Sequence, residues 1–189
     1  MAQPDDGACR YGKPVFLLAT NARLDTDIFW SEYGVNLTAC AEACRRDPRC
    51  RSLTFVKNAT DSYCQLMGTA ADAASATVTH ERTLSPVNGV YYMEKICLKG
   101  SCDRLFVAEW IQGMELEGHD NRVLRNATRR ACLEACATER SFVCRSAEWD
   151  DSSGECRLSR YDRFSRHVHF GRAARPSVSY FDNTCAYKP

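Results

Sequence analysis

Twelve cysteines recur along the chain in two sets of six, and their spacing is the strongest constraint on the fold. The first set falls at positions 9, 40, 44, 50, 64 and 97, and the second at 102, 132, 136, 144, 156 and 185. Successive intervals are 31, 4, 6, 14 and 33 residues in the first set and 30, 4, 8, 12 and 29 in the second. Because the intervals agree to within a few residues, we predict that one structural unit occurs twice.

The residues around the cysteines agree as well. The segment Cys40-Ala41-Glu42-Ala43-Cys44 matches Cys132-Leu133-Glu134-Ala135-Cys136, and similar aromatic segments precede the last cysteine of each set. We therefore predict two domains, residues 9–97 and 102–185, joined by a linker at residues 98–101. So short a linker leaves the domains little freedom to move independently.

The number of cysteines also indicates where the chain folds. Twelve cysteines in 189 residues are typical of a protein that folds where disulfides persist, so we expect an extracellular location. Residues 1–7 lack the basic and apolar segments of a signal peptide, so we expect this sequence to be a fragment of a longer secreted precursor. We expect no direct membrane insertion by the fragment, since it contains no apolar run long enough to span a bilayer. Spacing alone leaves the pairing of the cysteines open.

Each domain is predicted to contain one helix. Asn36 and Thr128 lie four residues before a C-x3-C pair, where a side-chain oxygen can cap the backbone, and helix-forming residues follow at 39–45 and 129–138. Short β-type runs surround the other cysteines, at 15–18, 52–56, 63–67, 90–93, 105–110, 145–149, 156–159 and 178–181. Phe55 and Trp149 each lie five residues after equivalent cysteines, as matched core aromatics. The predicted fold class is α+β, with one helix on an antiparallel sheet in each domain.

These features resemble the PAN/Apple domain, which has a C-x3-C helix, a strand that begins near a cysteine, a hairpin that returns to another, and a cysteine at each end. The resemblance covers nearly the whole chain, in two copies. It implies three disulfides in each domain, namely Cys9–Cys97, Cys40–Cys64 and Cys44–Cys50, and then Cys102–Cys185, Cys132–Cys156 and Cys136–Cys144. We expect a non-catalytic extracellular interaction module that binds a protein or a glycan.

A narrower resemblance concerns the second domain. Its segments at 142–147, 156–159 and 162–164 are similar to the tandem PAN regions of invertebrate zona pellucida-domain proteins of cuticle and apical extracellular matrix. That resemblance implies a component that attaches cells to an overlying matrix. The polymerisation domain of those proteins is not in this sequence, so we assign no polymerisation to it. The alternative is an accessory Apple-domain region of a secreted protease or of a growth-factor-like precursor.

We find no motif for catalysis or for a metal site. The sequence has no G-x-S-x-G, no H-E-x-x-H and no glycine-rich phosphate loop, and its cysteine spacings differ from the C-x2-C pairs of structural zinc sites. His167 and His169 would share one face of a strand and could bind a divalent ion, but unliganded surface histidines are the favoured interpretation. We therefore expect no enzyme, no cofactor and no metal.

Three N-glycosylation sequons begin at Asn36, Asn58 and Asn126. Asn58 is predicted in the tip of a hairpin at residues 58–61, which is the exposed kind of position that a glycan requires. Asn36 and Asn126 lie near the start of a predicted helix, where capping is the alternative role.

Arginines gather between residues 157 and 175 of the second domain. Six of them are accompanied by one acid, Asp162, although the whole chain carries 25 Lys+Arg against 24 Asp+Glu. This segment, with its interleaved aromatic residues, is a candidate for binding a sulfated polysaccharide or an acidic matrix protein, whereas a solvated arginine-rich loop is the favoured interpretation. Nucleic acid is not an expected partner, because the rest of the chain is neutral. The six are Arg157, Arg160, Arg163, Arg166, Arg172 and Arg175.

Overall fold

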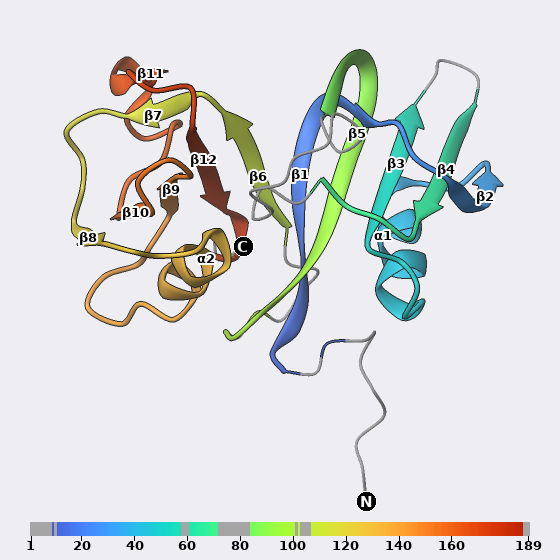
Figure 1. Ribbon diagram of the computed structural model, residues 1–189, viewed down its shortest axis with the longest axis horizontal. Coiled ribbons are helices and arrows are strands. Elements are labelled where there is room, and N and C mark those ends of the chain that lie inside the picture. Colours follow the sequence, from blue (N-terminus) through green and yellow to red (C-terminus); the bar gives the residue numbers. More distant parts are fainter. Residues whose placement is uncertain are drawn as a thin grey trace, which may run out of the picture. The chain divides into compact units, whose positions relative to one another are not determined.

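The computed structural model divides the chain into two compact units, Met1–Cys97 and Leu98–Pro189 (Figure 1). It describes residues 9, 11–57, 61–71, 84–100, 102 and 107–186. Each unit consists of one α-helix against a mostly antiparallel sheet, which confirms the predicted α+β fold class. Within the described residues, no helix combines the length and the apolar character needed to cross a membrane.

In the first unit the described strands form one sheet in the order β2-β4-β3-β5-β1. Strand β3 pairs antiparallel with both β4 and β5, and helix α1 packs on β3 and β4. The elements are β1 (Lys13–Leu24), β2 (Ile28–Tyr33), α1 (Leu37–Arg46), β3 (Ser52–Lys57), β4 (Ser62–Met67) and β5 (Leu84–Leu98).

The second unit repeats this arrangement with the strand order β6-β12-β9-β10-β8, and helix α2 packs on β9 and β10. A separate two-stranded ribbon of β7 and β11 is added to it. The elements are β6 (Val107–Gln112), β7 (Met114–Leu116), β8 (Arg122–Leu124), α2 (Arg129–Ala137), β9 (Ser146–Asp150), β10 (Glu155–Ser159), β11 (Phe170–Arg172) and β12 (Val178–Asn183). Two 3-10 turns, η2 (His167–His169) and η3 (Thr184–Ala186), complete the unit.

The helices begin where the sequence predicts. The side chain of Asn36 accepts a hydrogen bond from the backbone N–H of Ala39 at 2.8 Å, and the hydroxyl of Thr128 accepts one from the N–H of Ala131 at 3.1 Å. Each cap satisfies one of the backbone amides that the first turn of a helix leaves unpaired. Asn126, the other candidate cap, does not cap α2, because Thr128 occupies that position.

The cysteines pair within each unit, and all twelve lie among the described residues with none free. One cysteine of each helix is joined to the neighbouring strand β4 or β10, and the other to the loop that follows the helix. A third disulfide joins the first and last cysteines of each unit. The six pairs are Cys9–Cys97, Cys40–Cys64, Cys44–Cys50, Cys102–Cys185, Cys132–Cys156 and Cys136–Cys144, as the resemblance implies.

The two cores place aromatic residues at equivalent positions. Phe55 pairs in register with Cys64 across β3 and β4, and Trp149 pairs with Cys156 across β9 and β10. Both aromatic residues are buried, at 4% and 5% exposure. The matched aromatics that the cysteine spacing predicts therefore lie beside the disulfide that attaches each helix to its sheet.

Strands β2, β7, β8 and β11 are not among the predicted ones. Of these, β2 and β8 each form the outer strand of their unit's sheet, and their residues are exposed or half-buried throughout. A strand with neither face buried has no alternation of apolar and polar residues, so its sequence gives no periodic signal. The predicted strand at 105–110 begins in residues outside the described part of the chain and is observed from Val107 onward.

Candidate ligand-binding surface of the second unit

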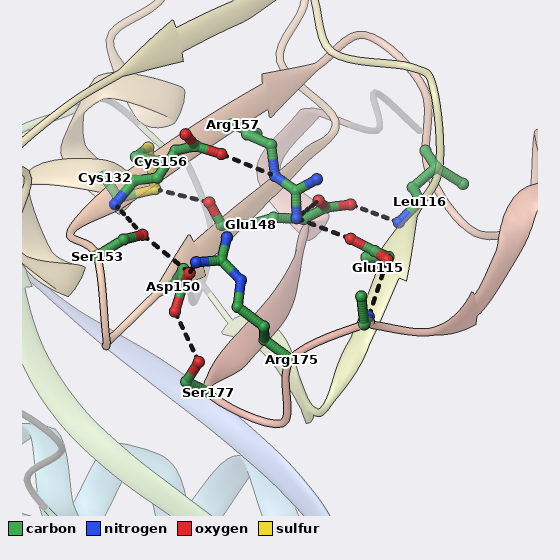
Figure 2. Close-up of polar contacts among 12 residues, drawn as sticks. Glu115, Leu116, Cys132, Glu148, Asp150, Ser153, Cys156, Arg157, Arg175 and Ser177 are labelled. Atoms are coloured by element: carbon green, nitrogen blue, oxygen red, sulfur yellow. Dashed lines mark hydrogen bonds and ion pairs between the residues drawn. A yellow bond between two sulfur atoms is a disulfide. The ribbon is translucent and has the colours of Figure 1, made fainter.

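Three of the six clustered arginines are paired with acidic side chains. Arg157 on β10 places one guanidinium nitrogen 2.9 Å from Glu115 and 2.9 Å from Glu148 (Figure 2). Arg175 lies 2.6 Å from Asp150 in the same view. These acids precede the arginine-rich segment in the sequence, so a local count of charge overstates the excess positive charge at this surface.

Arg163 is held in a second network. Its Nε atom lies 2.8 Å from Asp182 on β12, and its guanidinium also pairs with Glu109 on β6. Asp182 accepts a hydrogen bond from the hydroxyl of Tyr180 at 2.6 Å. Only 19% of the Arg163 side chain is exposed, and its guanidinium is engaged by these two acids.

Burial sets the electrostatics of these networks. It raises the pKa of Glu148 to about 7, although Arg157 and the N–H of Leu116 favour the charged carboxylate. Burial likewise raises the pKa of Asp182 to about 6, against the opposing effects of the Tyr180 hydroxyl and of Arg163. The cost of burying these acids is thus offset only in part by their partners.

Two other arginines lie against aromatic rings. The guanidinium carbon of Arg160 is 5.9 Å from the ring centroid of Phe142, and that of Arg166 is 4.1 Å from the centroid of Tyr161. A guanidinium over an aromatic face keeps its N–H groups directed outward, where they can donate to an anion. Phe164 adds a ring that is 68% exposed. We call Phe142, Arg160, Tyr161, Phe164 and Arg166 the arginine–aromatic surface; Arg172 is also exposed, on β11.

A fixed turn supports this surface. The carboxylate of Asp162 accepts hydrogen bonds from the backbone N–H groups of Phe164 at 2.9 Å and Ser165 at 2.7 Å. The N–H of Arg163 donates to the hydroxyl of Tyr180 at 2.8 Å, which attaches the turn to β12. The one acid of the segment therefore shapes its backbone in addition to balancing charge.

The histidine pair does not form the predicted strand. His167 and His169 lie in the 3-10 turn η2, which the N–H of His169 closes by donating to the carbonyl of Arg166 at 3.0 Å. The ring of His169 packs edge-on against His119, with centroids 4.6 Å apart. Among the described residues, no three histidine, cysteine or acidic side chains are grouped to hold a metal ion.

A groove of about 330 Å³ lies next to this surface, between the loop after α2 and the turn η3. Phe142 belongs to both features. The groove is lined by Cys136, Ala137, Glu139, Arg140, Phe142, Val143, Cys144, Asn183, Cys185 and Ala186. No sequence pattern indicates this groove, because its two walls are about forty residues apart in the chain.

The sequons are exposed where the structure describes them. Asn36 caps α1 and is exposed, and Asn126 is exposed with a left-handed backbone, at a φ of 54°. Asn58 lies outside the described residues, as do residues 59 and 60 of the hairpin tip predicted at 58–61.

Two disulfide-rich α+β units in tandem, with exposed arginines and a groove on the second unit, make up the described part of the chain. The family model described as PAN domain matches residues 9–97 and 102–185, so the chain belongs to the PAN domain family. PAN/Apple domains are typically non-catalytic modules that bind proteins or carbohydrates outside the cell.

One similar solved structure is the solution ensemble of the two N-terminal apple domains of Toxoplasma gondii microneme protein 4. It is 18% identical to this chain, with 88% of each chain covered and a TM-score of 0.30. No curated protein matches the chain.

Proposed function

We propose that this chain is a non-catalytic interaction module of an apical extracellular matrix, and that its second domain contacts a sulfated polysaccharide through the arginine–aromatic surface. The observation that carries the proposal is the position of Arg166 over the ring of Tyr161 and of Arg160 over the ring of Phe142. Such cation–π contacts restrain flexible cationic side chains before any ligand arrives, so less conformational entropy is lost on binding.

The ion pairs beneath the surface support the same function. Arg157 and Arg163 connect the arginine-rich segment to strands β9 and β12 through Glu148 and Asp182. These ion pairs favour a rigid platform over the alternative of a solvated loop. Guanidinium groups on a rigid platform suit sulfate and carboxylate groups, because each can donate two parallel hydrogen bonds.

The matrix setting is supported by the sequence. The segments at 142–147, 156–159 and 162–164 that resemble zona pellucida-domain proteins of apical matrix include Phe142 and the turn at Asp162. These segments include Phe142 and Phe164 of the candidate surface and lie next to its arginines, Arg160 and Arg166.

Chromatography on immobilised heparin tests the proposed ligand class. The double variant Arg160→Ala/Arg166→Ala is expected to elute at clearly lower salt than the unchanged protein, because two cationic contacts are lost. The matched control is Arg46→Ala/Arg51→Ala, which removes two exposed arginines from the first domain. Equal elution of the double variant and the unchanged protein, or an equal shift for the control, would contradict the proposal.

A further inference from the structure

The groove beside the arginine–aromatic surface suits a smaller ligand than a polymer segment or a protein. Its volume of about 330 Å³ lies at the lower end of the range of roughly 300–1,000 Å³ seen for small-molecule sites. A stable protein partner would instead need roughly 800 Å² of surface on each side. The size favours one or two sugar rings.

The charge of the groove selects an anionic ligand. Glu139 is its one acid, and that carboxylate is already occupied by the N–H groups of Arg140 and Ser141, the Ser141 hydroxyl, and Arg122 at 2.9 Å. The hydrogen bonds from Ser141 and Arg122 lower the pKa of Glu139 to about 2. The negative charge of Glu139 is therefore compensated within the protein.

The guanidinium of Arg140 has no such compensation. Arg140 is exposed, and no carboxylate of the described residues lies within ion-pair distance of its side chain. Phe142 and Val143 follow it on the same wall, and Val143 is 59% exposed. A pyranose ring carries polar groups around its edge and C–H groups on its faces. A guanidinium group beside apolar side chains can therefore contact both parts of such a ring.

The two walls are held together without a ligand. The disulfide Cys136–Cys144 ties the loop after α2 to the helix. From the opposite wall, the amide of Asn183 donates to the carbonyl of Cys144 at 2.8 Å and accepts from the N–H of Cys185 at 3.2 Å. The groove is therefore preformed.

We propose that this groove binds one carboxylated sugar unit, with Arg140 donating to the carboxylate and with Phe142 and Val143 contacting the ring. The inference rests on the proposed glycan-binding function and deepens it, because Phe142 joins the groove to Arg160. A polysaccharide that carries both groups would place its sulfates on the arginine–aromatic surface and a carboxylate in the groove.

Titration of the intact two-domain protein with three small sugars tests the groove separately from the heparin-binding surface. An unsulfated hyaluronan tetrasaccharide supplies a uronate, 3′-sialyllactose supplies a sialate, and lactose supplies neither. Calorimetry or amide chemical shifts would report the binding. We expect one or both acidic sugars to bind and lactose not to bind. Which of the acidic sugars binds shows whether the groove accepts a uronate or a sialate.

Two substitutions in the groove make the test decisive. Arg140→Gln and Val143→Glu are each expected to weaken binding of the acidic sugar about tenfold or more, while Arg46→Gln, at an exposed position of the first domain outside both proposed surfaces, changes it by less than about twofold. Far-UV circular dichroism checks that each variant is folded. The proposal would be overturned if neither acidic sugar bound, or if lactose bound as well as they do. It would also be overturned if folded Arg140→Gln kept the affinity of the unchanged protein for the acidic sugar. Heparin retention is measured alongside, since its loss in Arg160→Ala/Arg166→Ala bears on the proposed function independently of the groove.

Discussion

Arg157 and Glu148 face each other across strands β10 and β9 of the second domain, with 2.9 Å between Nη2 and Oε2 (Figure 2). The corresponding cross-strand pair of the first domain is Gln65 and Thr54, which is uncharged. One copy of the repeated unit thus contains a largely buried ion pair where the other contains a neutral pair.

Replacing one partner of this ion pair should destabilise the second domain. Arg157→Gln leaves Glu148 in the sheet without its cation, and loss of one partner of a buried pair costs about 3 kcal/mol. The double variant Glu148→Thr/Arg157→Gln reproduces the pair of the first domain and should recover part of that loss. Urea unfolding of the three proteins measures both effects. A double variant that is less stable than Arg157→Gln would show that the neutral pair does not fit this site.

The stability of the second domain should decrease as the pH rises from about 4.5 to about 7. Burial raises the pKa of Glu148 from 4.5 to about 7, so in this range the folded state binds a proton that the unfolded state has released. Asp182, with its pKa raised to about 6, acts in the same direction. Urea midpoints measured across this range should therefore fall with pH.

The variant Glu148→Gln isolates one contribution to this slope. It should flatten the pH dependence but leave the part due to Asp182, because the two groups belong to separate networks. A slope that is unchanged in Glu148→Gln, or a midpoint that rises between these pH values, would refute the assignment.

The sequence predicted the features that depend on local chemistry. The helix caps at Asn36 and Thr128 and the core positions of Phe55 and Trp149 follow from residues near a cysteine. The charge balance of the arginine-rich segment could not be predicted, because the partners of Arg157 and Arg163 come from other strands. Their pairing depends on strand order, which spacing along the chain does not define.

The groove shows the same limitation. Arg140 and Asn183 lie on opposite walls, and only the fold brings their segments together. In the same way, the exposed edge strand β2 exists because β4 offers it a partner, and its own sequence lacks the alternation of a half-buried strand.

The disulfides of the first domain should differ in what they contribute. Cys9–Cys97 spans 88 residues and Cys44–Cys50 spans 6, so restriction of the unfolded chain predicts roughly 4.6 and roughly 2.2 kcal/mol. Paired Cys→Ser variants, compared by urea unfolding, measure the difference. An equal loss for both would mean that contacts in the folded state, rather than loop length, determine the stabilisation.

Asn36 should serve both as a helix cap and as a glycan acceptor, because its side-chain oxygen accepts from Ala39 while the residue is exposed. Made without glycosylation, Asn36→Ala should lose about 1 kcal/mol of stability, whereas Asn36→Asp and Thr38→Ala should lose little, since both retain a capping oxygen. Secreted from a glycosylating host, all three variants should lack the glycan mass that the unchanged protein carries at this site.

Peptide mass spectrometry after glycosidase treatment and urea unfolding separate the two roles of Asn36. Unmodified Asn36 peptides from the secreted protein would remove the glycan role and leave the cap. If Asn36→Asp were as unstable as Asn36→Ala, the cap would instead be ruled out as the reason for the loss, because aspartate accepts the same backbone hydrogen bond as well as asparagine does.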